Sequence, residues 1–221
     1  MKTKFGVHSE TLANQKLKNG YTLYDWVMRQ HEFPAFWGRG LSALSADEVT
    51  FLREKDCKIL PVADTLTELQ VSRSNGQEDA LQAVEAAKAL GIPQNRTVAL
   101  FALIQPDWSV NHNWMISFAQ TLWDNGYIPG FMGNTDSSKN FNFDRQCSHF
   151  VQATADAHQF GAIYGATEPK CEGSPETWTP YCPSALNPQH IGLWMCGTTT
   201  FDTLEIDDVY ARDENALAIL W

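Results

Sequence analysis

The chain has 221 residues, of which 43% are hydrophobic and 19% charged, and its formal net charge is -10. This length suffices to bury a full core without disulfide or metal staples, and it fits a single domain spanning 1–221. The negative charge repels a phosphate backbone, so we expect no nucleic-acid partner. No apolar run approaches the length needed to cross a bilayer, which predicts no membrane span.

The compartment is open at this stage. Residues 1–4 lead directly into a strand-like segment without the apolar stretch of a secretory signal, and export or association with a cell wall is compatible with this start. The five cysteines are an odd number. Cys171 and Cys182 lie in one Pro-rich segment and could pair, and we expect the other three to be reduced.

The first third of the chain predicts two strands, each followed by a helix. Residues 4–9 form the first strand, and the helix after it begins near Leu23 with Thr22 as its N-cap. Residues 35–39 form the second strand. Ser45 with Glu48 has the spacing of a capping box, which opens the second helix.

The middle third repeats the same alternation. A strand over 58–63 leads to a helix that begins near Gln77 and is closed by Gly91. The longest apolar run, 98–104, predicts the next strand, and the helix after it ends at Gly126.

The last third keeps the strands but loses the regular helices. A helix is predicted around Cys147 and Phe150, and a long loop is predicted over 167–189, which holds five prolines. The remaining predicted strands are 127–133, 161–164, 191–195 and 203–209. Continuous apolar runs indicate strands that helices cover on the outside, so the fold class is α/β, a (β/α)8 TIM-like barrel with a degenerate last third.

A barrel of this kind carries its chemistry on the residues that follow its strands. Two carboxyl groups about 5 to 10 Å apart can cleave a glycosidic bond, one as acid and the other as base or nucleophile. Any single acid at a strand end can instead cap a helix or bind an arginine, and this alternative stays open. The candidate catalytic residues are Asp64, Asp107, Asp136, Glu168 and Asp207.

Aromatic and polar side chains at the same strand ends are the candidates for substrate binding. Aromatic faces pack well against the apolar faces of sugar rings, although large aromatics at strand positions are often simply core. The candidates are His8, Trp37, Arg39, Gln105, Tyr164 and Trp194. The sequence has no helical histidine pair, phosphate-binding glycine loop or dinucleotide fingerprint, so we expect neither a metal nor a cofactor.

Seven segments, taken in order, carry a family resemblance. They are Phe36-Trp37-Gly38-Arg39, Leu44-Ser45-Ala46-Asp47-Glu48, Ile59-Leu60-Pro61-Val62, Gly76-Gln77-Glu78-Asp79-Ala80, Ala89-Leu90-Gly91-Ile92-Pro93, Asn125-Gly126-Tyr127-Ile128-Pro129-Gly130 and Ile191-Gly192-Leu193-Trp194. Together they resemble the glycoside-hydrolase-like domain of unknown function 1906. That domain is similar in turn to the lysozymes of glycoside hydrolase family 25, which cut peptidoglycan.

The chain departs from the lysozyme pattern at two strand ends. The lysozymes end their first strand in Gly-x-Asp, whereas this chain has His8 at the corresponding place. Their fourth strand ends in acidic residues that include the proposed proton donor, whereas this chain has Gln105, which cannot deliver a proton. Asp207 matches the acid of their last strand.

These observations give three hypotheses. The first is a glycoside hydrolase of lysozyme type acting on peptidoglycan or another polysaccharide, with Asp64, Glu168 and Asp207 as the leading acids and His8 as a positioning group. It predicts that hydrolysis is lost when Glu168 or Asp207 becomes its amide. The second is a non-catalytic carbohydrate-binding or effector-associated barrel that has lost the catalytic acid. The third is a different chemistry on the same barrel, because fold does not fix function.

Overall fold

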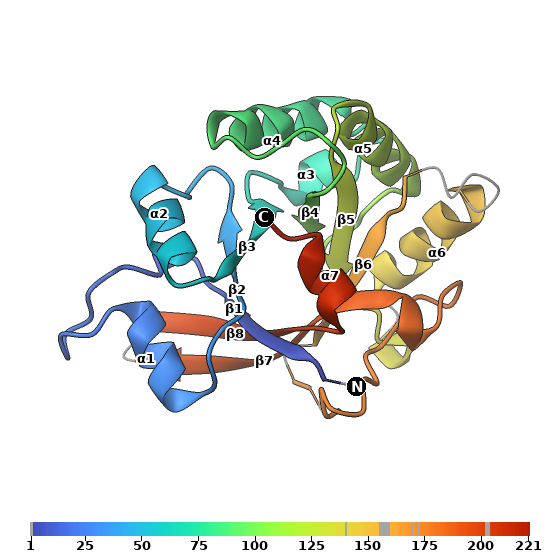
Figure 1. Cartoon of the computed structure of the whole chain (residues 1–221). Coiled ribbons are helices and arrows are strands. Elements are labelled where there is room, and N and C mark those ends of the chain that lie inside the picture. The colour runs from blue at the N-terminus through green and yellow to red at the C-terminus, as the bar shows by residue number, and fades with distance from the viewer. Residues whose placement is uncertain (1, 140, 155–159, 169, 172, 202–203) are drawn as a thin grey trace.

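The structure, a computed structural model, describes residues 2–139, 141–154, 160–168, 170–171, 173–201 and 204–221. Its centre is a closed barrel in which neighbouring strands follow the order of the chain (Figure 1). The strands are β1 (Lys4–His8), β2 (Phe36–Gly40), β3 (Lys58–Ala63), β4 (Ala99–Leu103), β5 (Ile128–Gly133), β6 (Ile163–Glu168), β7 (Ile191–Phe201) and β8 (Leu204–Ala211). The predicted α/β barrel is confirmed.

Helices surround this barrel (Figure 1). They are α1 (Leu23–Gln30), α2 (Ala46–Glu54), α3 (Glu68–Val71), α4 (Gln77–Ala89), α5 (His112–Asp124), α6 (Asn142–Thr154) and α7 (Glu214–Ala218), with short 3-10 turns η1 (Ser137–Lys139) and η2 (Pro188–His190). Thr22 and Ser45 cap α1 and α2 as predicted, since each side chain accepts a hydrogen bond from the amide three residues on. Within the described residues no helix is long and apolar enough to cross a membrane.

The last strand differs from the regular barrel pattern. The pairs from β1–β2 to β6–β7 are parallel, but β8 runs antiparallel to both β7 and β1. Asp207 was expected among the residues at the end of a parallel strand, and this is wrong, because it lies within the antiparallel strand β8. The amino-terminal half of β8 therefore lies beside the carboxyl end of β1, where His8 is the direct neighbour of Asp207.

Alternate residues of each strand point into the barrel or out toward the helices, as the two-residue repeat of a strand requires. The interior cluster draws on several strands and includes Phe36, Val62, Phe101, Met132 and Val209. The C-terminal segment closes one end of this interior. Leu220 packs inside it, and the main chain of Trp221 exchanges hydrogen bonds of 2.8 and 3.0 Å with that of Ile59.

Several boundaries differ from the sequence prediction. The strand predicted over 161–164 continues to Glu168, and the strand predicted over 191–195 continues to Phe201, because the two pair with each other and β7 goes on to pair with β8. The prediction had also omitted the short helices α3 and α7. Residue 203, where the last predicted strand began, lies outside the described residues.

The disulfide differs from the proposed pairing. Cys171 is bonded to Cys196 of β7, whereas Cys182 is free and half-buried. The cause is the register of β6 with β7, which places Glu168 beside Cys196 and so brings Cys171, three residues further along, within reach. The bond ties the segment that follows β6 to the edge of β7.

A candidate active site at the barrel mouth

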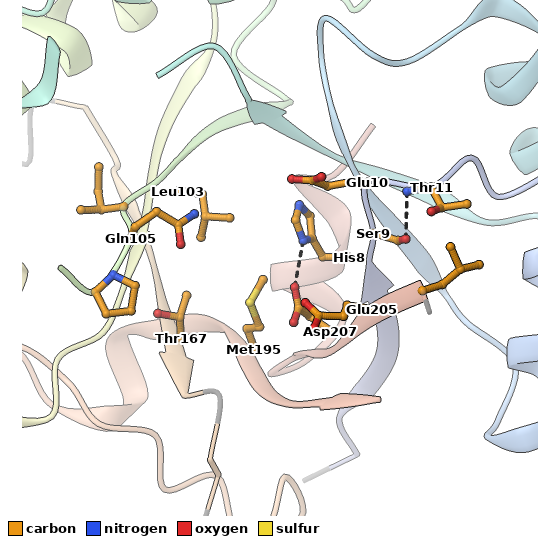
Figure 2. A pocket seen from close by; sticks show the side chains of 13 residues that line it. His8, Ser9, Glu10, Thr11, Leu103, Gln105, Thr167, Met195, Glu205 and Asp207 are labelled. Atoms are coloured by element: carbon orange, nitrogen blue, oxygen red, sulfur yellow. Dashed lines mark hydrogen bonds and ion pairs between the residues drawn. The ribbon is translucent and has the colours of Figure 1, made fainter. Parts of the chain in front are cut away.

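The carboxyl ends of β1, β3, β4 and β6 surround an open depression, here called the barrel mouth. It consists of two adjoining cavities of about 560 and 470 Å³ that share His8, Ser9, Glu10, Leu103 and Gln105. The larger also has Thr167, Met195, Glu205 and Asp207 in its wall (Figure 2), and the smaller has Asp64 and Trp108. His8 thus lies where the two cavities meet.

His8 and Asp207 form a hydrogen-bonded pair across neighbouring strands. Nδ1 of His8 is 3.1 Å from Oδ2 of Asp207, and the hydroxyl of Thr198 donates to the other carboxylate oxygen at 2.9 Å (Figure 2 shows the first of these contacts). This contact fixes the ring and leaves Nε2 with no hydrogen-bond partner among the described side chains. The arrangement matches the pairing by which a carboxylate orients a catalytic imidazole.

Asp64 directly follows β3, and β2 lies between it and the strand of His8. Its side chain lines the smaller cavity of the mouth. Its carboxylate accepts hydrogen bonds from the amide and the hydroxyl of Ser42, at 3.1 and 2.6 Å. Two glycines of β2 leave room for this side chain and for His8. A Cβ at Gly38 would lie 3.0 Å from the His8 ring, and one at Gly40 would collide with the Asp64 carboxylate. His8 and Asp64 therefore approach each other over a bare stretch of β2.

The remaining lining gives the mouth its chemical character. Glu10 and Glu205 are exposed acids on its wall, and Gln105 stands at the end of β4. Trp108 is a half-buried aromatic side chain beside Asp64, where a sugar ring could stack. The mouth therefore combines several acids, one histidine and one aromatic face.

Sequence reasoning had singled out neither Thr198 nor Glu205. Both depend on the hairpin of β7 with β8, in which Thr198 is paired with Asp207. The alternating polar residues of 198–207 were the signal for an antiparallel hairpin at this rim.

Arg39 borders the smaller cavity of the mouth but is buried. Its Nε lies 3.1 Å from Oε1 of Glu48 on α2, and its Nη1 donates to the carbonyl of Ser9 at 2.7 Å. Glu48 had been expected to complete a capping box with Ser45, but its carboxylate instead accepts from the amide of Ala13 at 2.8 Å. Arg39 thus holds the chain that follows His8, and its guanidinium is engaged in this network rather than free for substrate.

Glu168 lies beside the mouth but faces outward. Thr167 of the same strand lines the cavity, so the next side chain points to the opposite face. There the Glu168 carboxylate is 5% exposed and accepts from the amide of Tyr181 at 2.7 Å. Burial raises the pKa of Glu168 above its ordinary value, and the hydrogen bond from Tyr181 opposes this effect. In this position Glu168 holds the long loop, and the geometry does not support its predicted catalytic role.

Three aromatic residues predicted to contact substrate do not line the mouth either. Trp37 is fully buried beneath α1 and α2, where its ring lies 5.8 Å from that of Tyr24. Trp194 is fully buried and packs edge-on against Trp178. Tyr164 borders a separate cavity on the α6 side of the barrel. The three share one reason for lying outside the mouth, which is that each occupies an outward-facing position of its strand.

Two further acids follow their strands as predicted but stand apart from both cavities. Asp107 is exposed beyond β4, and Asp136 after β5 accepts hydrogen bonds from the amide and hydroxyl of Ser138 at 2.9 and 2.6 Å. Asp136 thus caps its own turn. Of the five candidate catalytic acids, the structure brings Asp64 and Asp207 together in the mouth.

Asp208 offers a test of charge burial next to this site. Burial raises its pKa, as does the neighbouring Asp207, whereas His31 lowers it, and its Oδ1 has no hydrogen-bond partner among the described residues. A raised pKa in the folded state means that the ionised form is disfavoured. The stability that the protonated form gives is present at low pH and is lost as the pH rises through the folded-state pKa.

We therefore expect Asp208→Asn to raise the Tm by about 2 °C at pH 7, equivalent to about 0.5–1 kcal/mol after allowance for solvent screening. The gain should shrink as the pH falls through the raised folded-state pKa of Asp208 and should be lost below about pH 4, where the carboxyl is neutral in the folded and the unfolded chain alike. Calorimetric scans at both pH values measure it, with Asp107→Asn as the exposed control. An equal gain at both pH values would contradict the burial of charge as its cause.

The acids of the mouth are not arranged as a metal site. Among the residues that the structure describes, no group of three or more His, Cys, Asp or Glu side chains could hold a metal ion.

Comparison with known proteins places the fold but no activity. No family model matches the chain, and no curated protein matches it. It is similar to an uncharacterized protein of B. stearothermophilus, with 25% identity over 99% of this chain and all of the other and a TM-score of 0.75. It is also similar to the Tat-secreted protein Rv2525c of Mycobacterium tuberculosis in complex with HEPES, with 11% identity over 94% of each chain and a TM-score of 0.57. The class of the fold is a TIM-like barrel.

Proposed function

We propose that the barrel mouth binds a polysaccharide and hydrolyses its glycosidic bonds, with peptidoglycan as the first substrate to test. The observation that carries this proposal is the meeting of Asp64, Asp207 and His8 in one open depression beside Trp108. Glycoside hydrolysis needs one group to protonate the leaving oxygen and one carboxylate to attack the sugar or activate water. Asp64 and Asp207 are the candidate acids that reach the depression.

The family resemblance supports the same reading. The segments similar to the glycoside-hydrolase-like domain of unknown function 1906 include residues 36–39 of β2, where Gly38 lies against His8, and residues 59–62 of β3, which lead to Asp64. The Cys171–Cys196 disulfide favours an oxidising compartment, where cell-wall polysaccharides are met. We therefore propose activity outside the reducing cytosol.

The test is an assay of reducing ends released from purified peptidoglycan and from chitin, with the two carboxylates changed in turn. We expect Asp64→Asn and Asp207→Asn each to lower kcat/KM at least about 100-fold, because each removes a carboxylate that lines the mouth. Glu168→Gln is the matched comparison. It should keep most of the activity, since Glu168 faces the loop and not the mouth. Full activity in both aspartate variants would remove the assignment.

A second candidate function is a non-catalytic glycan-binding barrel. Gln105 favours it, because the strand end that carries the proton donor in the similar lysozymes holds an amide here. Co-sedimentation with peptidoglycan and chitin separates the two proposals. Binding without release of reducing ends supports the module, and release that disappears in Asp64→Asn supports the hydrolase.

A further inference from the structure

The missing proton donor has a replacement in the mouth. We propose that His8, in its protonated form, is the general acid that protonates the leaving oxygen of the glycoside, with Asp207 as the residue that positions and stabilises it. This inference rests on the proposed hydrolase function and deepens it. It assigns to His8 a catalytic role where the sequence comparison gave it only a positioning role.

The position of His8 supports this role. It lies at the junction of the two cavities, so a glycan that spans the mouth passes over its ring. Its side chain is 13% exposed, which leaves the ring edge accessible while the rest is held by protein. Gly38 of β2 presents no side chain to the ring, so the ring can lie flat over that strand.

The hydrogen-bond pattern fixes which nitrogen is available. Asp207 engages Nδ1 at 3.1 Å, and this contact holds the ring so that its other nitrogen faces the mouth. Thr198 occupies the other oxygen of Asp207, so this carboxylate is committed to the ring and to β7. Nε2 is the nitrogen that stays free to donate a proton (Figure 2).

The surrounding polar groups complete the reaction. Gln105 lines both cavities but has no proton to give, and Glu10 and Glu205 are exposed acids on the wall. Asp64, whose carboxylate lies against Gly40 of β2, is the carboxylate that we assign to the activation of water. The histidine and this carboxylate approach the bound glycan from opposite sides of β2.

The Nε2–H bond of His8 breaks and its proton joins the leaving oxygen while the bond from the anomeric carbon to that oxygen breaks with its electron pair. Water attacks the anomeric carbon and gives its proton to Asp64. Solvent then returns a proton to His8 and removes one from Asp64, so that the net reaction is glycoside plus water to a free sugar and an alcohol.

Substrates that differ only in their leaving group test the proposal. They are the phenyl and the 2,4-dinitrophenyl glycosides of N-acetylchitobiose and of the peptidoglycan disaccharide. Phenolate needs a proton to leave and 2,4-dinitrophenolate does not, so loss of a general acid affects the first far more. We expect His8→Asn to lower kcat/KM at least about 100-fold for the phenyl glycosides and less than about 10-fold for the dinitrophenyl glycosides.

Two further variants complete the design. Asp207→Asn keeps the shape of the site but removes the carboxylate that holds His8. It should therefore also lower kcat/KM more for the phenyl glycosides than for the dinitrophenyl glycosides. His149→Asn, a change at an exposed histidine of α6 that does not line the mouth, should leave both rates unchanged. Circular dichroism of each variant checks that the barrel is folded, and His8→Gln replaces His8→Asn if the latter does not fold.

The outcomes separate the two proposals. If the wild type cleaves neither pair of glycosides and releases no reducing ends, the hydrolase function fails and the role of His8 fails with it. If the wild type is active and His8→Asn lowers kcat/KM equally for both leaving groups, or for neither, the role of His8 is overturned while the hydrolase function stands.

Discussion

Glu48→Gln is expected to lower the free energy of unfolding by about 4 kcal/mol and the Tm by about 10 °C. Arg39 and Glu48 have side-chain exposures of 2% and 0%, and they contact each other at 3.1 Å. Removal of one partner leaves the other charge buried without compensation, which is more costly than loss of the pair itself. Urea unfolding at neutral pH, followed by circular dichroism, measures the change.

A matched variant and a double variant identify the cause. Glu54→Gln changes an exposed acid on the same helix, and its effect should stay within about 0.5 kcal/mol. Arg39→Met with Glu48→Leu removes both buried charges and should recover part of the loss. Recovery will be incomplete, because the carbonyl of Ser9 and the amide of Ala13 lose their partners. A loss below about 1 kcal/mol in Glu48→Gln would show that the pair is solvated.

The same network links stability to the candidate site. Arg39 bonds the carbonyl of Ser9, and Ser9 directly follows His8 at the end of β1. The orientation of His8 therefore depends on two contacts, one from Asp207 to its ring and one from Arg39 to the chain beside it. An arginine predicted to bind substrate instead holds the segment that carries the proposed acid.

The strands of the barrel were predictable because their apolar runs are long and separated by capped helices. Residues 58–63 were predicted to the residue, and the start of α4 at Gln77 was as well. Local chemistry decides such boundaries, since the caps at Thr22 and Ser45 act on neighbouring amides. Sequence reasoning therefore located the barrel and the end of it at which the candidate site was then sought.

The direction of each side chain was much less predictable. Successive residues of a strand face opposite sides, so an error of one position exchanges a cavity residue for a buried one. Thr167 and Glu168 illustrate this, because the threonine lines the mouth and the acid lies under the loop. Asp207 and Asp208 illustrate it again on β8. In continuous apolar strands no alternation in the sequence reveals which residues face inward.

The direction of β8 was the second feature that could not be predicted from the sequence. A parallel strand would have placed its last residues at the mouth, whereas the antiparallel strand places its first residues there. The pairing of His8 with Asp207 follows from this direction and from the register with β1. Both depend on contacts between residues that are far apart in the chain, which short motifs do not encode.

Reduction of the Cys171–Cys196 disulfide is expected to destabilise the protein by about 3 kcal/mol and to lower the Tm by about 6–12 °C. The bond closes a segment with a sequence separation of 25, and it restricts the unfolded chain by this amount in the chain-entropy model. It also ties down the loop whose Tyr181 amide binds Glu168. Thermal scans with and without reductant measure the effect.

Cysteine variants distinguish the bond from the thiols. Cys196→Ser should reproduce the loss and should no longer respond to reductant, whereas Cys182→Ser changes a free thiol of the same loop and should have little effect. Thiol titration of the denatured, unreduced wild type should find three free thiols out of five cysteines. Five free thiols would show that the bond does not form. The disulfide would then no longer support an oxidising compartment. A partnership of Cys171 with Cys182, the pairing considered from the sequence, would instead make Cys182→Ser as damaging as Cys196→Ser is expected to be.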